Sequence, residues 1–248
     1  MKRKVVAFVV IWVILIGPLP ALAQDKLSAA VAANFISAFK ELAARFEAKT
    51  KTKVEGTFSS TGALYSQIVN GAPYDIFLSA DETRPAVLFR DGIADKPFVY
   101  ARGRVILWSA DENFCKGPSW QDALKYRKIK KIAIANPLTA PYGAAAQTAL
   151  RKAGLWDTLQ DKLVIAQNIA QSFQYANTLA VDACFCALSV TAAPEGKRGC
   201  YFPVSEAPET VQSACLLKKS KNRAAAQQFS AFLNSPEGTE VKMKYGYH

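Results

Sequence analysis

Short apolar runs alternate along the chain with segments in which apolar residues recur every three or four positions. The runs predict buried strands, and the periodic segments predict helices that cover them. Strands are predicted at 27–33, 53–59, 74–80, 104–110, 130–136, 163–168, 183–190 and 213–219. Helices are predicted from Asn34, at 62–69, after Asp81, at 144–152, at 169–180 and within 223–245. This alternation is typical of an α/β fold.

Four junctions between a predicted strand and the following helix share one kind of composition. Each carries small, hydroxyl or amide residues: Ala33-Asn34, Ser60-Thr61-Gly62, Pro141-Tyr142-Gly143 and Asn168-Ile169. The start of a helix has free backbone N–H groups and a partial positive charge, so it binds anions without a formal cation. In open α/β sheets, ligands lie beyond the carboxyl ends of the strands. Helix capping explains any single junction, but the four together predict an anion site.

The first residues predict a secretory signal peptide. Basic residues 2–4 precede an apolar run at 5–17, and Ala21-Leu22-Ala23 is a typical cleavage site. A retained membrane anchor is the alternative, but the apolar run is short for a span. We therefore expect cleavage after Ala23, so that 1–23 is removed, and a soluble mature chain in the periplasm.

The charge of the mature chain limits its partners. Removal of residues 1–23 leaves 28 basic and 20 acidic residues, a net charge of +8. A basic balance suits an anionic partner. The basic runs at 125–131 and 218–223 lack the interleaved aromatic residues of a single-strand binder, so we expect solvated surface there and no nucleic-acid partner.

Residues suited to catalysis or metal binding are scarce. The single histidine, His248, is the last residue, where we expect fraying. A Ser-His-Asp or Cys-His enzyme is therefore not favoured, and the cysteine spacing fits no zinc pattern. We expect no enzyme, no cofactor and no direct metal-cation site. Asp75 and Asp81 are expected to serve the structure, the first as an anchor in a strand and the second as a helix cap.

The mature chain contains five cysteines: Cys115, Cys184, Cys186, Cys200 and Cys215. An oxidising compartment and an odd count predict up to two disulfides and about one free thiol. A direct bridge between Cys184 and Cys186 would be strained, because both lie on one face of a predicted strand. We expect a bridge between Cys200 and Cys215, since both lie in strand-like segments joined by a Pro-containing turn.

Five stretches resemble the periplasmic molybdate-binding proteins of ABC importers: "AAN" (32–34), "FSSTGALYSQIVNGAPYDIFLSAD" (58–81), "NPLTAPYGAAAQTAL" (136–150), "AGLWDTLQDKLV" (153–164) and "KYGY" (244–247). The resemblance covers nearly the whole mature chain. It implies a two-lobed, type II-like periplasmic binding fold, in which each lobe is a mixed sheet flanked by helices and the ligand lies in the cleft. We expect lobe 1 at 24–103 and 213–248, and lobe 2 at 104–212.

The same resemblance implies which residues contact the oxyanion: Asn34, Ser60, Thr61, Tyr142, Ile169 and Ser189. Tyr142 and Ile169 are expected to contribute backbone N–H groups. Many members of the family carry a tyrosine at the position of Ser189, whose side chain is too short to reach the same point. We infer that the hydroxyl of Tyr142, where many members have alanine, replaces it. The alternative is that Tyr142 only packs between the lobes.

The expected ligand follows from its hydrogen-bonding chemistry. Molybdate at neutral pH is deprotonated and only accepts hydrogen bonds, so a shell of N–H and O–H donors suits it. Phosphate largely keeps a proton and needs an acceptor, and the smaller sulfate would have to be rejected by cavity size. The expected function is capture of molybdate, and of tungstate, by a monomer that delivers it to an ABC permease. Two alternatives stay open: a binding protein for another anion, such as sulfate, a phosphonate or a small organic anion, and an exported serine hydrolase with a Ser-Lys pair.

Overall fold

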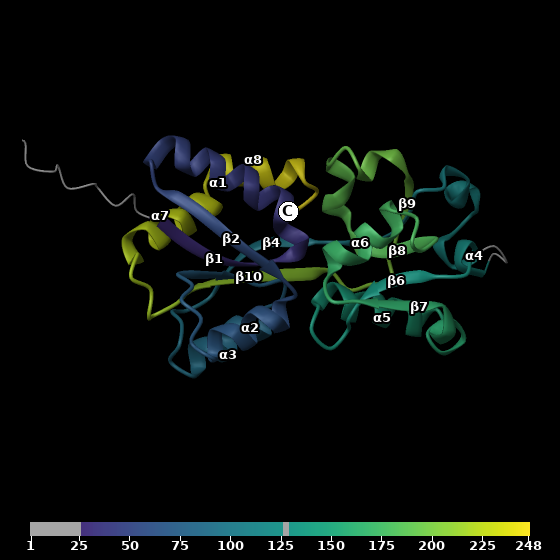
Figure 1. Ribbon diagram of the computed structural model, residues 1–248, viewed down its shortest axis with the longest axis horizontal. Coiled ribbons are helices and arrows are strands. Elements are labelled where there is room, and N and C mark those ends of the chain that lie inside the picture. Colours follow the sequence, from purple (N-terminus) through teal and green to yellow (C-terminus); the bar gives the residue numbers. More distant parts are fainter. Residues whose placement is uncertain (1–25, 126–128) are drawn as a thin grey trace, which may run out of the picture.

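The computed structural model describes residues 26–125 and 129–248, and the predicted signal peptide with its cleavage site lies outside them. The described residues form two five-stranded sheets, each with helices on both faces (Figure 1). The two halves lie side by side, and the C-terminus lies between them (Figure 1). The prediction of a two-lobed α/β fold is confirmed.

The first lobe is built on a sheet with the strand order β2-β1-β3-β10-β4. β1 (Lys26–Ala32) pairs in parallel with β2 (Lys53–Ser59) and β3 (Ile76–Leu78). β10 (Thr210–Leu216) runs antiparallel to β3 and to β4 (Phe98–Gly103). One face carries α1 (Ile36–Thr50), α7 (Arg223–Leu233) and α8 (Pro236–Lys244), and the other carries α2 (Thr61–Val69) and α3 (Thr83–Arg90) (Figure 1).

The second lobe has the strand order β7-β6-β8-β5-β9. β6 (Ile132–Ala135) is parallel to β7 (Leu163–Ala166) and β8 (Ala183–Ala187), while β5 (Val105–Ser109) is antiparallel to β8 and β9 (Cys200–Pro203). Helices α5 (Pro141–Lys152) and α6 (Ile169–Asn177) cover its faces, and α4 (Trp120–Lys125) lies at the outer end (Figure 1).

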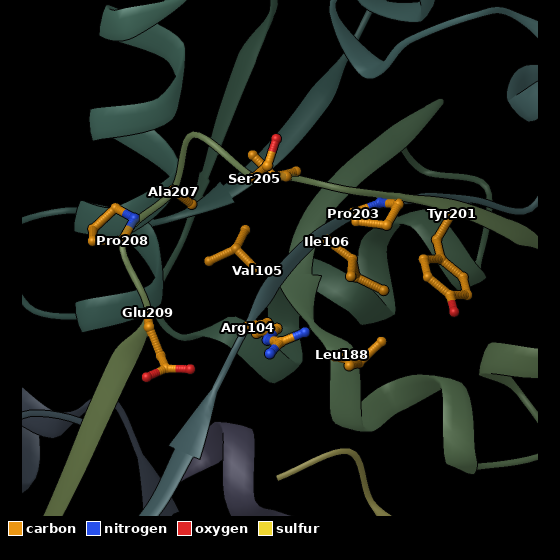
Figure 2. A pocket seen from close by; sticks show the side chains of 11 residues that line it. Arg104, Val105, Ile106, Leu188, Tyr201, Pro203, Ser205, Ala207, Pro208 and Glu209 are labelled. Atoms are coloured by element: carbon orange, nitrogen blue, oxygen red, sulfur yellow. The ribbon is translucent and has the colours of Figure 1, made fainter. Parts of the chain in front are cut away.

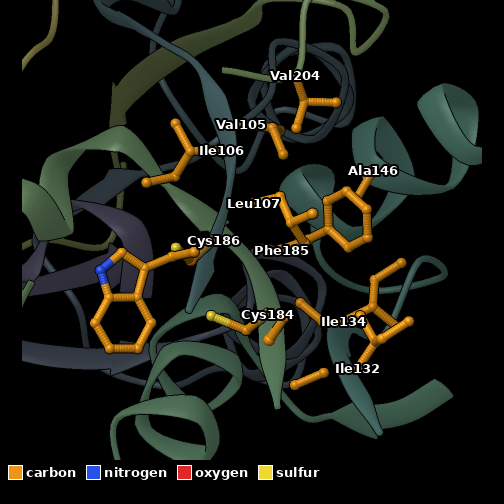
Figure 3. Packing of buried hydrophobic residues seen from close by; sticks show 14 of the residues in the cluster. Val105, Ile106, Leu107, Ile132, Ile134, Ala146, Cys184, Phe185, Cys186 and Val204 are labelled. Carbon is orange, nitrogen blue, oxygen red and sulfur yellow. The ribbon is translucent and has the colours of Figure 1, made fainter. Parts of the chain in front are cut away.

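The middle strands of the second sheet are buried along their whole length. Every residue of β5, β6 and β8 is buried, and Leu107 of β5 lies beside its strand partner Phe185 of β8 in this core (Figure 3). Strands buried on both faces have continuous apolar sequences rather than alternating ones. This explains why these three strands were predictable from their apolar runs.

Several predicted elements have different bounds in the structure. β3 has three residues instead of the predicted 74–80. The strand predicted at 183–190 ends at Ala187, and the chain continues as a 3-10 helix at Leu188–Ala192, which removes Ser189 from the sheet. α5 begins at Pro141 rather than at 144, since proline is well suited to the first turn of a helix.

Two segments cross between the lobes. One runs from β4 through Gly103 and Arg104 into β5, and the other is residues 204–209, which link β9 to β10. The lobe boundaries predicted at 103/104 and 212/213 remain predictions. β10 begins at Thr210 and therefore spans the second of them.

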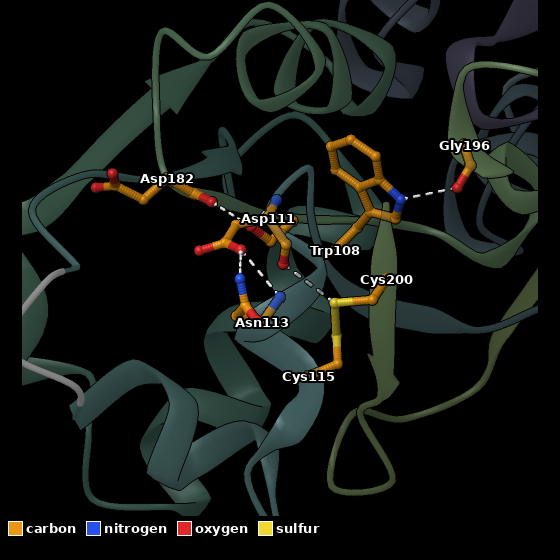
Figure 4. Close-up of a disulfide and its surroundings, with 8 residues drawn as sticks. Trp108, Asp111, Asn113, Cys115, Asp182, Gly196 and Cys200 are labelled. Carbon is orange, nitrogen blue, oxygen red and sulfur yellow. Dashed lines mark hydrogen bonds between the residues drawn. A yellow bond between two sulfur atoms is a disulfide. The ribbon is translucent and has the colours of Figure 1, made fainter. Parts of the chain in front are cut away.

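The disulfide joins Cys115 and Cys200, with Cα atoms 5.9 Å apart, and ties the 3-10 helix Glu112–Lys116 to β9 (Figure 4). The predicted bridge between Cys200 and Cys215 is therefore wrong. The Pro-containing segment between them crosses from one lobe to the other, so Cys200 lies on the second sheet and Cys215 is buried in the first. Three thiols are free instead of the expected one: Cys184, Cys186 and Cys215.

The two predicted structural carboxylates hold backbone N–H groups. Asp75, one residue before β3, accepts from the N–H of Ser28 at 2.7 Å. Asp81 accepts from the N–H of Arg84 at 2.9 Å in the first turn of α3, although the N-cap position of that helix is Glu82. The C-terminal histidine differs from expectation. The N–H of Arg102 donates to the carbonyl of His248 at 2.7 Å, and the N–H of His248 donates to the carbonyl of Arg102 at 3.2 Å. The last residue is therefore held in place rather than frayed.

No helix within 26–125 and 129–248 combines the length and the apolar character that a membrane span requires.

Candidate functional site

Four helix starts meet between the lobes. The 3-10 helix Ala33–Phe35, which leads into α1, and α2 begin at the ends of β1 and β2, while α5 and α6 begin beyond β6 and β7. Parallel strands end at the same edge of a sheet, so the two starts of each lobe lie at one edge. The starts from both lobes line one pocket, so the two edges face each other. The residues that line the small pocket between them are Ala32, Ala33, Asn34, Ser59, Ser60, Thr61, Ala140, Pro141, Tyr142, Asn168 and Ile169.

Five of the six predicted contact residues line this pocket: Asn34, Ser60, Thr61, Tyr142 and Ile169. The sixth, Ser189, is not part of its lining. The Ser189 hydroxyl donates to the backbone carbonyl of Asn34 at 2.9 Å, so its one proton is already used. This geometry gives Ser189 a supporting position behind Asn34.

Backbone N–H groups provide hydrogen-bond donors from both lobes. Neither the 3-10 helix at Asn34 nor α5 has a side-chain cap, so no cap occupies the first N–H groups of these helices. In α6 the side chain of the cap Asn168 accepts from the N–H of Gln171. The cap therefore does not occupy the N–H of Ile169, a residue that lines the pocket. The pocket is thus placed where helix starts offer N–H groups and positive potential.

The hydroxyl groups of the second junction act as acceptors toward the protein. Thr61 Oγ1 accepts from the N–H of Ala80 at 3.0 Å, and Ser60 Oγ accepts from the N–H of Ala63 at 3.4 Å as the cap of α2. A hydroxyl group both accepts and donates. The protons of Thr61 and Ser60 therefore remain for a ligand.

A buried network of phenols and amides lies beside the pocket. Asn34 Nδ2 donates to Gln212 Oε1 at 2.8 Å and to the hydroxyl of Tyr247 at 3.2 Å. Gln212 Nε2 donates to the Tyr142 hydroxyl at 3.2 Å, and the Tyr100 hydroxyl lies 3.1 Å from Gln212 Oε1. The network joins α5 of the second lobe to β4, β10 and the C-terminal residues of the first.

This network limits the donors that Asn34 can offer to a ligand. Both hydrogens of its side-chain amide are engaged by Gln212 and Tyr247, so the backbone N–H is the donor that remains for a ligand. Sequence reasoning missed Gln212, Tyr100 and Tyr247. The "KYGY" ending was a signal for Tyr247, whereas Gln212 looks like an ordinary polar position of a strand and gave none.

Burial keeps the phenols of the network neutral. Loss of hydration raises the pKa of Tyr142 and of Tyr100 well above the ordinary value, and raises the pKa of Tyr247 to about 12. All three therefore keep their protons at neutral pH. Among the described residues, no carboxylate, lysine, arginine or histidine lines the small pocket, so the donors they offer are uncharged groups. Over the described ranges, no group of three or more His, Cys, Asp or Glu is arranged to hold a metal ion.

The lobes touch each other at the rim of this pocket. The N–H of Gly62 donates to the carbonyl of Thr139 at 2.8 Å, and Arg84 Nη2 donates to the carbonyl of Leu138 at 3.2 Å. The pocket encloses about 10 Å³, close to the space that one water molecule requires. The structure is therefore a closed form of the two lobes.

A larger pocket, of about 480 Å³, lies on the second lobe beside the crossing segments (Figure 2). Val105, Ile106 and Leu188 contribute to a mainly apolar lining, and Arg104 and Glu209 are its charged residues. This pocket lacks the converging helix starts of the small one. It does not match the predicted anion site.

The two-lobed fold and the donor-lined pocket between the lobes are features of a solute-binding protein. Residues 27–248 match the family described as bacterial extracellular solute-binding protein, and the chain belongs to that family. Among its relatives is the molybdate-binding protein ModA of Azotobacter vinelandii, 40% identical over 227 residues, covering 90% of this chain and 89% of the relative. ModA of Rhodobacter capsulatus is 39% identical over 234 residues, covering 92% and 90%.

Solved structures agree with these sequence relatives. The Azotobacter vinelandii periplasmic molybdate-binding protein matches with a TM-score of 0.84 and 33% identity, covering 90% of this chain and 98% of that one. The predicted resemblance to periplasmic molybdate-binding proteins is thereby confirmed. The sulfate-binding protein SubI of Mycobacterium tuberculosis shares the fold alone, with a TM-score of 0.70 at 14% identity over 90% of this chain and 86% of that one. The fold by itself therefore does not select the anion.

Proposed function

We propose that this protein captures molybdate, and also tungstate, in the periplasm and delivers it to the membrane permease of an ABC importer. The observation that carries the proposal is a pocket between two lobes that offers hydrogen-bond donors and contains no acidic side chain. The relatives at 40% and 39% identity, both named molybdate-binding proteins, support the choice of anion.

The chemistry of the pocket suits a fully deprotonated oxyanion. The hydroxyls of Ser60 and Thr61 accept from backbone N–H groups and can each still donate a proton to a ligand. The backbone N–H groups of Asn34, Tyr142 and Ile169 complete the proposed contact set. Such donors match an anion that only accepts hydrogen bonds, whereas protonated phosphate would leave its own O–H without an acceptor.

Capture requires the lobes to move apart from their arrangement in this structure, because about 10 Å³ is room for one water molecule and not for a tetrahedral oxyanion. A bound oxyanion would then accept hydrogen bonds from both lobes when they are together and from one lobe when they are apart. It would favour the closed form because it binds that form more tightly. We propose that this closed monomer is the form recognised by the permease. The signal peptide expected at 1–23 would direct the chain to the periplasm.

Calorimetry on the mature chain tests the proposal. Molybdate and tungstate should bind tightly, and sulfate and phosphate weakly. Sulfate binding as tight as molybdate binding would favour the alternative of a general oxyanion protein. Tyr201→Phe, in the larger pocket, is a control that should leave molybdate affinity unchanged, while Thr61→Val should weaken it.

The serine hydrolase considered from sequence is not proposed. The Ser60 hydroxyl caps α2 by accepting from Ala63, and in the part of the chain that the structure describes no lysine or histidine lines the pocket to take its proton. Activation of a serine nucleophile requires an adjacent base. An absence of turnover on simple esters is the expected result.

A further inference from the structure

One acceptor fixes the direction of the hydrogen bonds beside the pocket. The backbone carbonyl of Asn34 can only accept, and the Tyr247 hydroxyl lies 2.6 Å from it. The Tyr247 proton is therefore used, and the Tyr247 oxygen accepts from the side-chain amide of Asn34 at 3.2 Å. This places the amide nitrogen of Asn34, not its oxygen, on the side of Tyr247.

The orientation of Asn34 determines that of Gln212. The nitrogen Nδ2 of Asn34 lies 2.8 Å from the Gln212 amide, so the Gln212 atom that faces it must be the acceptor Oε1. The Gln212 nitrogen then faces the Tyr142 hydroxyl at 3.2 Å and donates to it. Gln212 is 0% exposed, so solvent cannot take over this contact.

A Tyr142 hydroxyl that accepts from Gln212 keeps its own proton for another acceptor. The acceptors within its surroundings are the oxygen of Tyr247, with which it interacts, and a ligand in the pocket that Tyr142 lines. An ionised oxygen is a stronger acceptor than a neutral phenol. A bound oxyanion would therefore receive the proton.

Gly103, on the crossing segment, holds the hydroxyl in this position. A Cβ atom built on Gly103 would lie 1.9 Å from the Tyr142 hydroxyl oxygen and 2.9 Å from Gln212 Nε2. The hydroxyl thus rests directly against the glycine backbone, where any side chain would displace it. The contact with Gly103 and the hydrogen bond from Gln212 together fix the position of the Tyr142 phenol.

We propose that Gln212 is a positioning residue for oxyanion binding, whose amide N–H turns the Tyr142 hydroxyl so that its proton points to the anion. The inference rests on the proposed function and deepens it. Gln212 does not line the pocket and acts through Tyr142. Because Gln212 belongs to β10 and Tyr142 to α5, the donor is oriented only when the two lobes are together.

The first test is a double-mutant cycle on molybdate affinity. Gln212→Glu keeps the size of the side chain and the acceptor for Asn34, but replaces the donor to Tyr142 by an acceptor. Gln212→Glu and Tyr142→Phe should each weaken binding by roughly tenfold or more, as expected for a hydrogen bond to a charged group. The double variant should lose much less than the product of the two, because no hydroxyl remains to be turned. Thermal unfolding without ligand reports whether each variant folds.

The second test is the pH profile of Gln212→Glu, which a merely structural role would not change. Protonation of the new carboxyl restores a donor to Tyr142, so molybdate affinity should rise as the pH falls from alkaline to mildly acidic. The titratable side chains hydrogen-bonded to Gln212 are the neutral phenols of Tyr100 and Tyr142. Tyr247 interacts with Tyr142, and Asp81 acts on Tyr100. Lys242, whose pKa burial lowers to about 8, donates to the Tyr100 carbonyl from α8, so the parent chain is titrated alongside as the reference. The exposed Gln228→Glu adds the same charge on α7 and should follow the parent.

The outcomes separate the two proposals. A parent chain that binds neither molybdate nor tungstate contradicts the proposed function itself. A parent that binds, with losses that multiply fully in the double variant, contradicts the role of Gln212 alone. The role of Gln212 is also contradicted if Gln212→Glu binds as tightly as the parent over the whole pH range. It is contradicted as well if adding Tyr142→Phe to Gln212→Glu leaves the pH profile of Gln212→Glu unchanged.

Discussion

The backbone N–H of Gly62 donates to the carbonyl oxygen of Thr139 at 2.8 Å, and this bond joins the first lobe to the second. A Cβ atom built on Gly62 would lie 3.0 Å from both the Cα and the carbonyl oxygen of Thr139, and 3.2 Å from Arg84 Nη2. The glycine in the hydroxyl-rich junction therefore serves the close approach of the lobes.

Gly62→Ala should separate folding from binding. Alanine in place of glycine in α2 should raise the stability of the ligand-free chain by up to about 1 kcal/mol, since it favours helix. Molybdate affinity should nevertheless fall several-fold, because the methyl group crowds the closed form. Gly117→Ala, where a Cβ meets nothing within 4 Å, is the control. Unfolding curves and calorimetry measure both effects, and unchanged affinity in Gly62→Ala would contradict the role of this contact in closure.

Glu41 predicts how the first lobe responds to acid. Its carboxylate accepts from Lys244 and Arg45, each at 2.7 Å, and from Tyr245 at 3.0 Å. The Lys244 contact, above all, holds the pKa of Glu41 below its ordinary value of 4.5. A carboxyl whose pKa is lower in the folded state stabilises the fold above its unfolded value, and this contribution is lost as the pH falls through the folded pKa.

Glu41→Gln should therefore lower the free energy of unfolding at neutral pH by up to about 1 kcal/mol, as for a partly exposed ion-pair group. The difference from the parent should shrink in acid, where Glu41 is protonated in both states. Denaturant unfolding at several pH values measures it, with the exposed Glu112→Gln as a control that should follow the parent. A difference that stays constant with pH would show that the charge of Glu41 is not its cause.

The disulfide should stabilise the second lobe without affecting the ligand. Cys115 and Cys200 are 85 residues apart, and closing a loop of that length contributes up to about 4–5 kcal/mol in the chain-entropy model. The double variant Cys115→Ala/Cys200→Ala should melt at a lower temperature but bind molybdate as before, since the bridge lies outside the pocket lining.

Thiol titration checks the pairing directly. The unfolded, unreduced chain should expose the three free thiols, and the native chain should react slowly because all of them are buried. Burial also raises the pKa of Cys215 to about 12, which disfavours its reactive thiolate. Detection of five thiols in the unreduced, unfolded chain would contradict the bridge.

The parts of the fold that sequence predicts well are those with a local physical cause. β5, β6 and β8 are buried on both faces and appear as apolar runs, and the caps Ser60 and Asn168 mark the starts of α2 and α6. The four junctions were predictable for the same reason. Each is a local strand-to-helix transition whose N–H groups must remain unpaired within the helix.

The parts that sequence did not predict depend on contacts between distant residues. Gln212 and Tyr247 meet Asn34 across 178 and 213 positions, and no local pattern encodes such a meeting. The predicted bridge between Cys200 and Cys215 was wrong for a similar reason. The segment between these cysteines carries the chain from the second lobe to the first. No local pattern distinguishes such a segment from a turn within one sheet.

Thr61 provides the sharpest test of the hydroxyl donors, because its oxygen is held by Ala80 at 3.0 Å and only its proton is left for the ligand. Thr61→Val keeps the volume and removes the hydroxyl, so molybdate affinity should fall about ten- to a hundredfold, mainly through faster dissociation. Thr61→Ser keeps the hydroxyl and should retain most of the affinity. Ser189→Ala should cost less than Thr61→Val, since Ser189 donates to the Asn34 carbonyl rather than to the pocket. Stopped-flow dissociation measures all three variants, and a Ser189→Ala effect larger than that of Thr61→Val would place the ligand contact on Ser189 instead.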